Sequence, residues 1–147
     1  MSSSQDIEAP KVASPLSSDT VTEGIRIQAD PSYVPDQSNP PKAEYLFAYH
    51  IRMTNEGKEI VRLVSRHWII INANGGQHEV RGPGVVGKHP KLTPGESFEY
   101  SSFCPLDTEW GTMEGSFEME RENGDHFQVA IGRFFLTTTG PTSTSRE

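Results

Sequence analysis

The stretch TMEGSFEME, Thr112–Glu120, decides the class of fold. Its odd-numbered positions are apolar or small, and its even-numbered positions are hydroxylic or acidic. Successive side chains of a strand point to opposite faces of a sheet, so this period of two is typical of a strand. A helix would instead repeat its apolar residues every three or four positions. The stretch therefore predicts an antiparallel strand with one face in a core and the other in solvent.

Two earlier segments also have the composition of strands. Residues 45–53 alternate in the same way, with every second side chain apolar on one face: Tyr45, Phe47, Tyr49, Ile51 and Met53. The segment Val61–Asn72 contains the continuous apolar run Trp68–Ile71, which favours a central strand. We expect Trp68 to lie in the core, with its indole N–H bonded to an acceptor there.

Turn signals separate these segments at the spacing of an all-β protein. Two of them, Asn55-Glu56-Gly57 and Asn74-Gly75-Gly76, predict hairpins, and Asn123-Gly124 predicts a third. Pro94-Gly95 suits a type II turn, in which glycine accepts a positive φ. Near Gly132 the apolar face of the last strand switches, which predicts a β-bulge.

About seven such strands predict an all-β fold, a two-sheet antiparallel sandwich. The arrangement is expected to be of the fibronectin type III or immunoglobulin-like kind. Every aromatic residue lies between residues 21 and 136, which we assign to one domain. Residues 1–20 and 137–147 are rich in Ser, Thr and Pro. They are therefore expected to be a disordered N-terminal tail and a flexible C-terminal tail.

The charge and cysteine content exclude several classes of protein. A net charge of −7 argues against nucleic-acid binding, which depends on neutralising phosphates. The single cysteine, Cys104, excludes an internal disulfide and suits a reducing compartment. No apolar run approaches the ~20 residues of a membrane-spanning helix, and residues 1–15 lack the pattern of a secretory signal. We therefore expect a cytoplasmic protein that does not enter membranes.

The stretch RGPGVVGKHP, Arg81–Pro90, contains the glycine spacing of a dinucleotide-binding loop. Such a loop must open a helix, and the prolines at 90 and 94 leave no room for one. Two interpretations remain. The loop is either a structural crossover between sheets or a concavity whose amides bind an anion. The second interpretation predicts a phosphate-containing ligand on these residues: Arg81, Gly82, Gly84, Gly87, Lys88 and His89.

Neither a metal centre nor a catalytic site is predicted. No pair of the five histidines has the spacing of metal ligands, and a zinc site would lack thiolate partners. An acidic strand face (Glu114, Glu118, Glu120 and Glu122) suits weak attraction of magnesium but also suits a solvated surface. Cys104 has no neighbouring base that spacing identifies, and no nucleophile-elbow motif occurs. We expect no cofactor, no metal site and no enzymatic activity.

Four segments together resemble the ApaG family. They are AEYLFAYHIRMTNEG (43–57), LVSRHWIIINANG (63–75), EVRGPGVVGKHPKLTPGESFEYSS (79–102) and GTMEGSFEM (111–119). The resemblance implies a fibronectin type III-like sandwich. Related domains end some eukaryotic F-box and polymerase-associated proteins, which implies a role in protein interaction. Bacterial members are associated with cobalt and magnesium efflux or resistance.

Three functions are consistent with the sequence. The first is a binding module for an unidentified protein partner. The second, implied by the family resemblance, is a role in cobalt or magnesium homeostasis. The third is binding of a phosphorylated small molecule or pyrophosphate at residues 81–89. A protein-binding role predicts an exposed apolar patch, a metal role predicts clustered ligands, and a phosphate role predicts convergent loop amides.

Overall fold

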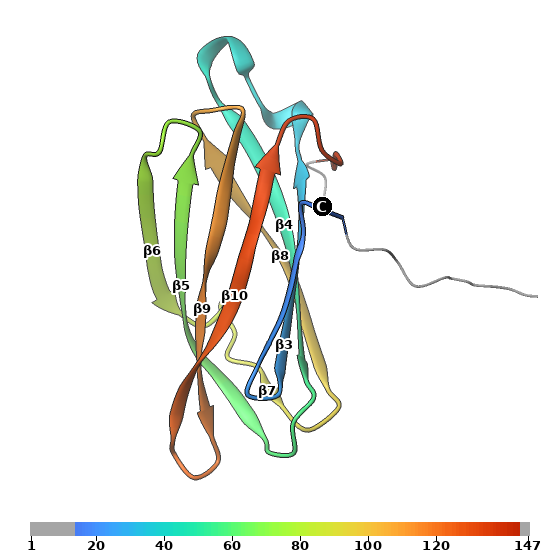
Figure 1. The fold of residues 1–147 in the computed structure, drawn as a ribbon, viewed down its shortest axis with the longest axis vertical. Coiled ribbons are helices and arrows are strands. Elements are labelled where there is room, and N and C mark those ends of the chain that lie inside the picture. Colours follow the sequence, from blue (N-terminus) through green and yellow to red (C-terminus); the bar gives the residue numbers. More distant parts are fainter. Residues whose placement is uncertain (1–13, 145–147) are drawn as a thin grey trace, which may run out of the picture.

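The computed structural model describes residues 14–144, which form two antiparallel sheets packed face to face (Figure 1). One sheet has the order β10-β9-β5-β6, and the short strand β7 also pairs with β5. Its strands are β5 (Val61–Asn72), β6 (Gln77–Pro83), β7 (Lys91–Leu92), β9 (Trp110–Arg121) and β10 (His126–Thr137). The other sheet has the order β2-β3-β4-β8. Its strands are β2 (Ser18–Thr22), β3 (Ile25–Tyr33), β4 (Tyr45–Asn55) and β8 (Ser97–Leu106).

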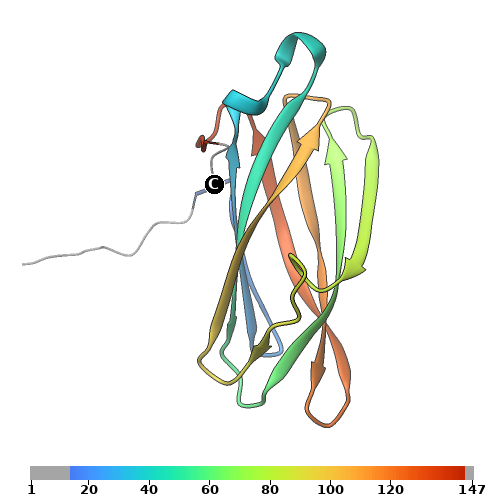
Figure 2. The ribbon, with the colours of Figure 1, turned by 180° about the vertical axis from the view of Figure 1, so that it is seen from behind.

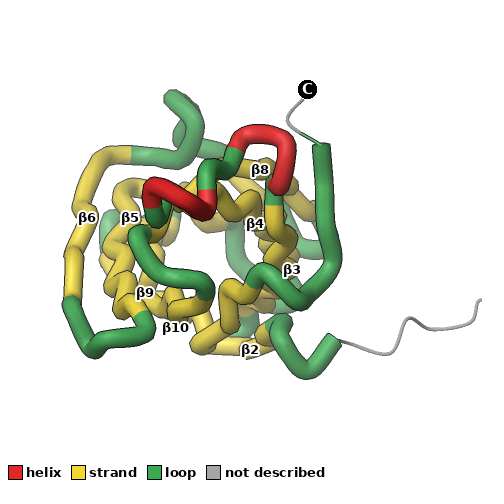
Figure 3. Tube along the Cα trace, turned by 90° about the horizontal axis from the view of Figure 1, so that it is seen from above, coloured by secondary structure: helices red, strands yellow, loops and turns green. Residues whose placement is uncertain are grey.

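The predicted two-sheet sandwich is therefore confirmed. The described residues contain two strands more than expected, because β2 begins within the segment assigned to a tail and β7 has only two residues. Two short 3-10 helices, η1 (Pro35–Gln37) and η2 (Pro40–Lys42), lie over one end of the sandwich (Figure 3). Within the described part of the chain, no helix has the length and apolar character needed to cross a bilayer.

The inner faces of the sheets form the core that the alternation predicted. Most of the alternating apolar positions of β4 and β9 are buried, and Phe47, Phe117 and Met119 are wholly inaccessible. Trp68 is 2% exposed, which confirms its place in the core. Its indole N–H, however, has no hydrogen-bond partner, so that part of the prediction is wrong. The reason is local, since aromatic rings surround the indole: Tyr49, Phe117 and Phe134.

Three of the turn and bulge predictions are confirmed. The β5–β6 and β9–β10 hairpins occur at the expected positions, with Gly75 and Gly124 at positive φ. The register of β10 on β9 shifts between Ile131 and Phe134, as expected for a bulge at Gly132. The hairpin prediction for Asn55-Glu56-Gly57 is wrong, because β4 and β5 lie in different sheets.

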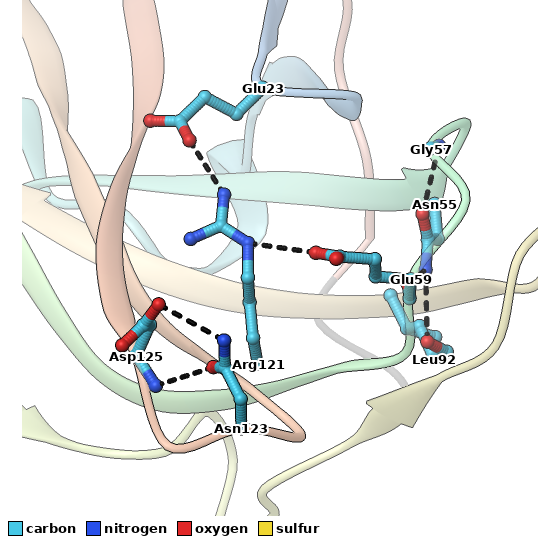
Figure 4. Close-up of polar contacts among 8 residues, drawn as sticks. All are labelled: Glu23, Asn55, Gly57, Glu59, Leu92, Arg121, Asn123 and Asp125. Atoms are coloured by element: carbon cyan, nitrogen blue, oxygen red, sulfur yellow. Dashed lines mark hydrogen bonds and ion pairs between the residues drawn. The ribbon is translucent and has the colours of Figure 1, made fainter.

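The Asn55 side chain stabilises this connection between sheets (Figure 4). Its amide group donates to the carbonyls of Glu59 and Leu92, at 2.7 and 3.0 Å, and its oxygen accepts from the Gly57 N–H at 2.9 Å. Asn55 is only 1% exposed, so these bonds satisfy a buried amide. A tight hairpin and a connection held by a buried asparagine give the same sequence signal, because both place asparagine shortly before glycine.

Arg121 ties three segments together at the same end of the sandwich (Figure 4). Its guanidinium lies 2.6 Å from the Glu23 carboxylate and 3.0 Å from that of Glu59. It also lies over the Phe127 ring, 3.9 Å from the centroid. Arg121 thus links the β2–β3 turn, the β4–β5 connection and the β9–β10 hairpin.

The domain extends beyond the predicted boundaries of 21 and 136. Strand β2 begins at Ser18, and residues after β10 return to pair with the end of β3. The Tyr33 N–H donates to the Pro141 carbonyl at 2.8 Å, and the Ser143 N–H donates to the Tyr33 carbonyl at 2.7 Å. Edge pairing uses backbone groups, so a segment with few apolar residues still joins a sheet. Residues 1–13 and 145–147 lie outside the described part of the chain.

Removal of residues 141–147 is expected to lower the free energy of unfolding by about 1–3 kcal/mol, because the backbone bonds to Tyr33 are lost. Denaturant unfolding of the shortened chain would measure the change. A chain that lacks only residues 145–147 is the control and should unfold like the full chain. An unchanged midpoint after removal of residues 141–147 would show that this pairing adds no stability.

The two long sides of the sandwich differ in how the edge strands of the two sheets are connected. On one side β2 lies beside β10 (Figure 3), and the Ser18 hydroxyl donates to the Gly132 carbonyl at 2.7 Å. The Phe135 N–H donates to the Leu16 carbonyl nearby, at 2.9 Å. On the other side, within residues 14–144, β6 pairs only with β5 and β8 pairs only with β4. We call the first side the closed seam and the second the open seam.

Candidate functional site

A cleft of about 920 Å³ lies at the open seam, between the edges of β6 and β8. This volume falls within the ~300–1,000 Å³ range of ligand-binding pockets. The side chains that line it are largely apolar and come from both sheets: Tyr45, Tyr49, Trp68, Ile70, Val80, Phe103, Cys104, Leu106 and Met113. Polar residues lie at its ends, with Asn72 and Asp107 at one end and Arg66 among the residues of the other.

The β8 wall of the cleft combines an exposed aromatic side chain with an unreactive thiol. Phe103 is 53% exposed, and the alternation along β8 places its side chain on the outer face of this strand, beside the cleft. Cys104, one residue further, is buried, and burial raises the pKa of its thiol to about 12. A thiol with so high a pKa carries almost no thiolate at neutral pH and is a poor nucleophile. This wall therefore suits binding rather than chemistry.

Arg66 of β5 lies between the cleft and the glycine loop. It shares a face with Trp68, two residues on, so its side chain enters the space between the sheets. Its Nη1 donates to the carbonyls of Pro83 and Gly84, both at 2.9 Å. The guanidinium also lies directly over Gly82, where any Cβ would come within about 3 Å of it. Glycine at position 82 leaves the space that Arg66 occupies.

The glycine loop, residues 84–90, connects β6 and β7, two strands that lie along the same edge of β5. Strands β6 and β7 both pair with β5, on either side of a register shift at Val64. The prediction of a crossover at this loop is therefore wrong, since the chain changes sheet only after β7. The loop passes between the sheets (Figure 2), and Val85 is wholly buried in the core. Arg66, which lines the cleft, binds the carbonyls of Pro83 and Gly84 at the start of this loop.

The loop amides are largely used within the protein. The Gly84 N–H donates to the Val64 carbonyl at 2.9 Å. Val85 and Lys88 exchange two backbone bonds of 2.8 Å and form a tight turn. Gly84 has a φ of 60°, and a Cβ there would overlap the Lys88 carbonyl, so the position requires glycine. These contacts explain two of the glycines by the geometry of the loop.

The six residues predicted for anion binding do not share one surface. The Arg81 side chain is 71% exposed and lies 3.4 Å from the Glu79 carboxylate. The imidazole of His89 lies instead against Gly84, with Nδ1 3.1 Å from the Leu63 carbonyl. Gly82 is covered by Arg66, whereas Gly87 and Lys88 lie in the exposed turn. Binding of a phosphate-containing ligand by this loop stays a prediction.

Val86, at the tip of the turn, has a strained backbone. Its φ is 43°, in the left-handed region that a β-branched residue rarely adopts, and its side chain is 51% exposed. Together with Gly87 at φ 78°, it forms the type I′ geometry that favours Asn-Gly. An exposed valine gains no burial here that would offset the strain.

Replacement Val86→Asn is expected to raise the free energy of unfolding by about 1 kcal/mol, because asparagine tolerates the left-handed region. Equilibrium unfolding in denaturant would measure the gain. Val21→Asn is the matched control, since Val21 is 55% exposed but lies in the extended strand β2. An equal gain in both variants would show that exposure, not backbone strain, is responsible.

Three of the five histidines, His50, His67 and His126, lie beside carboxylates. His126 Nδ1 lies 2.6 Å from Glu118, and its Nε2 lies 3.6 Å from Glu120. The hydrogen bond to Glu118 raises the pKa of His126, and the same bond lowers the pKa of the Glu118 carboxyl. Among residues 14–144, no three His, Cys, Asp or Glu side chains are placed to hold one metal ion.

Comparison with known proteins identifies the family. The family model described as the ApaG domain matches residues 35–121. A protein named ApaG from Methylobacterium sp. (strain 4-46) is 49% identical over 115 residues, covering 78% of this chain and 88% of that protein. The chain belongs to the ApaG family. Another ApaG protein, from Anaeromyxobacter dehalogenans, is 46% identical over 123 residues, covering 84% of this chain and 97% of that one.

Solved structures agree with this assignment to the ApaG family. The crystal structure of a putative ApaA protein from Bordetella pertussis has a TM-score of 0.76 and 45% sequence identity. It matches 85% of this chain, and the match covers 98% of that chain. The span matched by the ApaG model contains β5, β6, β8 and the glycine loop, so it contains both walls of the cleft.

Sequence reasoning missed the principal features of this ApaG-family site. From the sequence no role is assigned to Arg66, whereas its guanidinium lies between the sheets and binds loop carbonyls. One signal was present: Arg66 and Trp68 are two residues apart, so they share a face of the strand. The cleft itself had no local signal, because it depends on which strands lie at the sheet edges.

Proposed function

We propose that this ApaG-family protein acts by binding a partner protein, whose extended segment docks at the open seam along β8. The observation that carries the proposal is a cleft between two strand edges that have no neighbouring strand in the described part of the chain. A free edge offers backbone N–H and C=O groups to an added strand, and an adjacent cleft accepts its side chains. The exposed Phe103 supports this proposal, since aromatic side chains are enriched at interfaces.

Binding without catalysis agrees with the chemistry of the site residues. The Cys104 thiol has a high pKa, and the Ser65 hydroxyl donates to the Glu118 carboxylate at 3.0 Å rather than to a histidine. Neither residue has the partner that activates a nucleophile. The cleft supplies apolar surface and a few hydrogen-bonding groups, as binding requires.

Substitution at the rim of the cleft tests the proposal. The immobilised protein would be used to capture partners from its native cell extract, and bound proteins would be identified by mass spectrometry. Phe103→Asp places a charge beside the cleft and is expected to reduce capture of a specific partner by about tenfold or more. Phe135→Asp, at a residue 39% exposed on β10, is the matched control and should leave capture unchanged. Equal capture by both variants would contradict the proposal.

A further inference from the structure

We infer that the cleft binds a free C-terminus of the partner, with an apolar last side chain among its aromatic walls and the terminal carboxylate on Arg66. This inference rests on the proposed function and states the chemistry of the segment that docks. It follows from the charge of Arg66, from the donors that lack acceptors and from the closed end of the cleft.

The charge argument concerns Arg66. Arg26 and Arg121, which are also partly buried, have carboxylate partners. Among residues 14–144, the acceptors of the Arg66 guanidinium are only the neutral carbonyls of Pro83 and Gly84. The protein has a net charge of −7, so acidic residues are in excess. A shortage of carboxylates therefore does not explain why Arg66 is bonded to neutral carbonyls. A guanidinium that keeps donors free beside an apolar cleft is suited to a carboxylate from outside.

Two further donors near Arg66 have no acceptor. The indole N–H of Trp68, which lines the cleft, and the hydroxyl of Tyr100 are buried without a hydrogen-bond partner. Burial raises the pKa of Tyr100, Tyr49 adds to this rise, and the charge of Arg66 opposes it. Buried donors without acceptors are rare in folded proteins, so this part of the core has more donors than acceptors.

The shape of the cleft favours a chain end over an internal acidic residue. The glycine loop crosses between the sheets beyond Arg66 (Figure 2), and Val85 fills the core there. A peptide that runs along the cleft toward Arg66 therefore has to end at this point. The opposite end carries Glu44 and Asp107, which repel a carboxylate. Charge and shape thus place the terminus at Arg66.

A matched pair of small probes tests the inference without any substitution in the cleft. N-acetylphenylalanine carries an apolar side chain and a free carboxylate, and N-acetylphenylalaninamide is its neutral counterpart. Each would be titrated into the protein while NMR follows the indole Nε1–H of Trp68, with Trp110→Phe used to assign that signal. The acid is expected to shift the Trp68 signal and to bind about tenfold more tightly than the amide, as a charge-assisted bond predicts.

Variants locate the carboxylate. Arg66→Gln is expected to abolish the preference for the acid, whereas Arg81→Gln, at an exposed arginine beside the same loop, should retain it. Since Arg66 also binds the loop, the Arg66→Gln spectrum must keep the dispersed signals of the folded protein. If that variant unfolds, the comparison of acid and amide on the unaltered protein decides the question.

Three outcomes would overturn the inference. Equal affinity for acid and amide, or shifts confined to Arg81 and Lys88, would exclude a carboxylate on Arg66. N-acetylglutamylphenylalaninamide carries its only carboxylate on a side chain. If it binds as tightly as N-acetylphenylalanine, a chain end is excluded.

If none of these probes binds while capture still depends on Phe103, the inference is wrong and the proposed function stands. If the acid binds but capture does not depend on Phe103, the proposed function is wrong.

Discussion

Replacement Trp68→Ala is expected to lower the free energy of unfolding by about 3–5 kcal/mol, a large fraction of the stability of a domain of this size. The indole is 2% exposed and lies within 6.4 Å, centroid to centroid, of three other rings. Its removal leaves a cavity between the sheets that strands paired on both sides cannot close. Urea unfolding followed by circular dichroism would measure the loss.

Two controls separate packing from other effects of the Trp68 substitution. Trp110→Ala removes an indole that is 48% exposed and should cost less than about 1 kcal/mol. Trp68→Phe keeps an aromatic ring and loses an N–H that has no acceptor, so it should cost much less than alanine. A loss below about 1 kcal/mol for Trp68→Ala would show that the indole does not stabilise the core.

The second large effect is expected at Gly115, in the middle of β9. Gly115 lies opposite Trp68 on β5, and a Cβ there would overlap the His67 carbonyl and approach the Trp68 Cα. Backbone atoms of a central strand cannot move aside without loss of sheet pairing. Gly115→Ala is therefore expected to cost about 3 kcal/mol or more, as overpacking at a rigid site does.

Thermal unfolding of Gly115→Ala would show this cost as a lowered midpoint. Ser116→Ala is the matched control, because the next residue faces the other side of the sheet and bonds only to the Gln128 side chain, at 3.2 Å. Its midpoint should change little. An unchanged midpoint for Gly115→Ala would mean that β5 and β9 leave room for a Cβ at this position.

The fold was predictable because it depends on a periodic pattern. The alternation in Thr112–Glu120 sets which side chains of β9 are buried, and every apolar position named in β4 faces the core or lies beside it. The run Trp68–Ile71 placed Trp68 correctly for the same reason. These properties are local, so a single strand reveals them.

The candidate site was less predictable because it depends on contacts between distant residues. Position 82 requires glycine because Arg66, sixteen residues earlier, occupies the space above it. The cleft exists because β6 and β8 are both edge strands, and strand order is not encoded in any one segment. The glycine spacing at 82, 84 and 87 was visible in the sequence and resembles that of a phosphate-binding loop. In the structure, Gly82 leaves space for Arg66 and Gly84 avoids the Lys88 carbonyl.

The difference between the two long sides of the sandwich has a consequence for its motion. Hydrogen bonds join β10 to β2 and to the segment before it, whereas no such bonds were found between β6 and β8 in the described residues, so we expect the sheets to separate first at the open seam. Amide hydrogens of β6 and β8 should therefore exchange with solvent through local opening, well before those of β9 and β3. Hydrogen-exchange mass spectrometry would detect this order. The volume of the cleft would then adjust to ligands of different size without unfolding the domain.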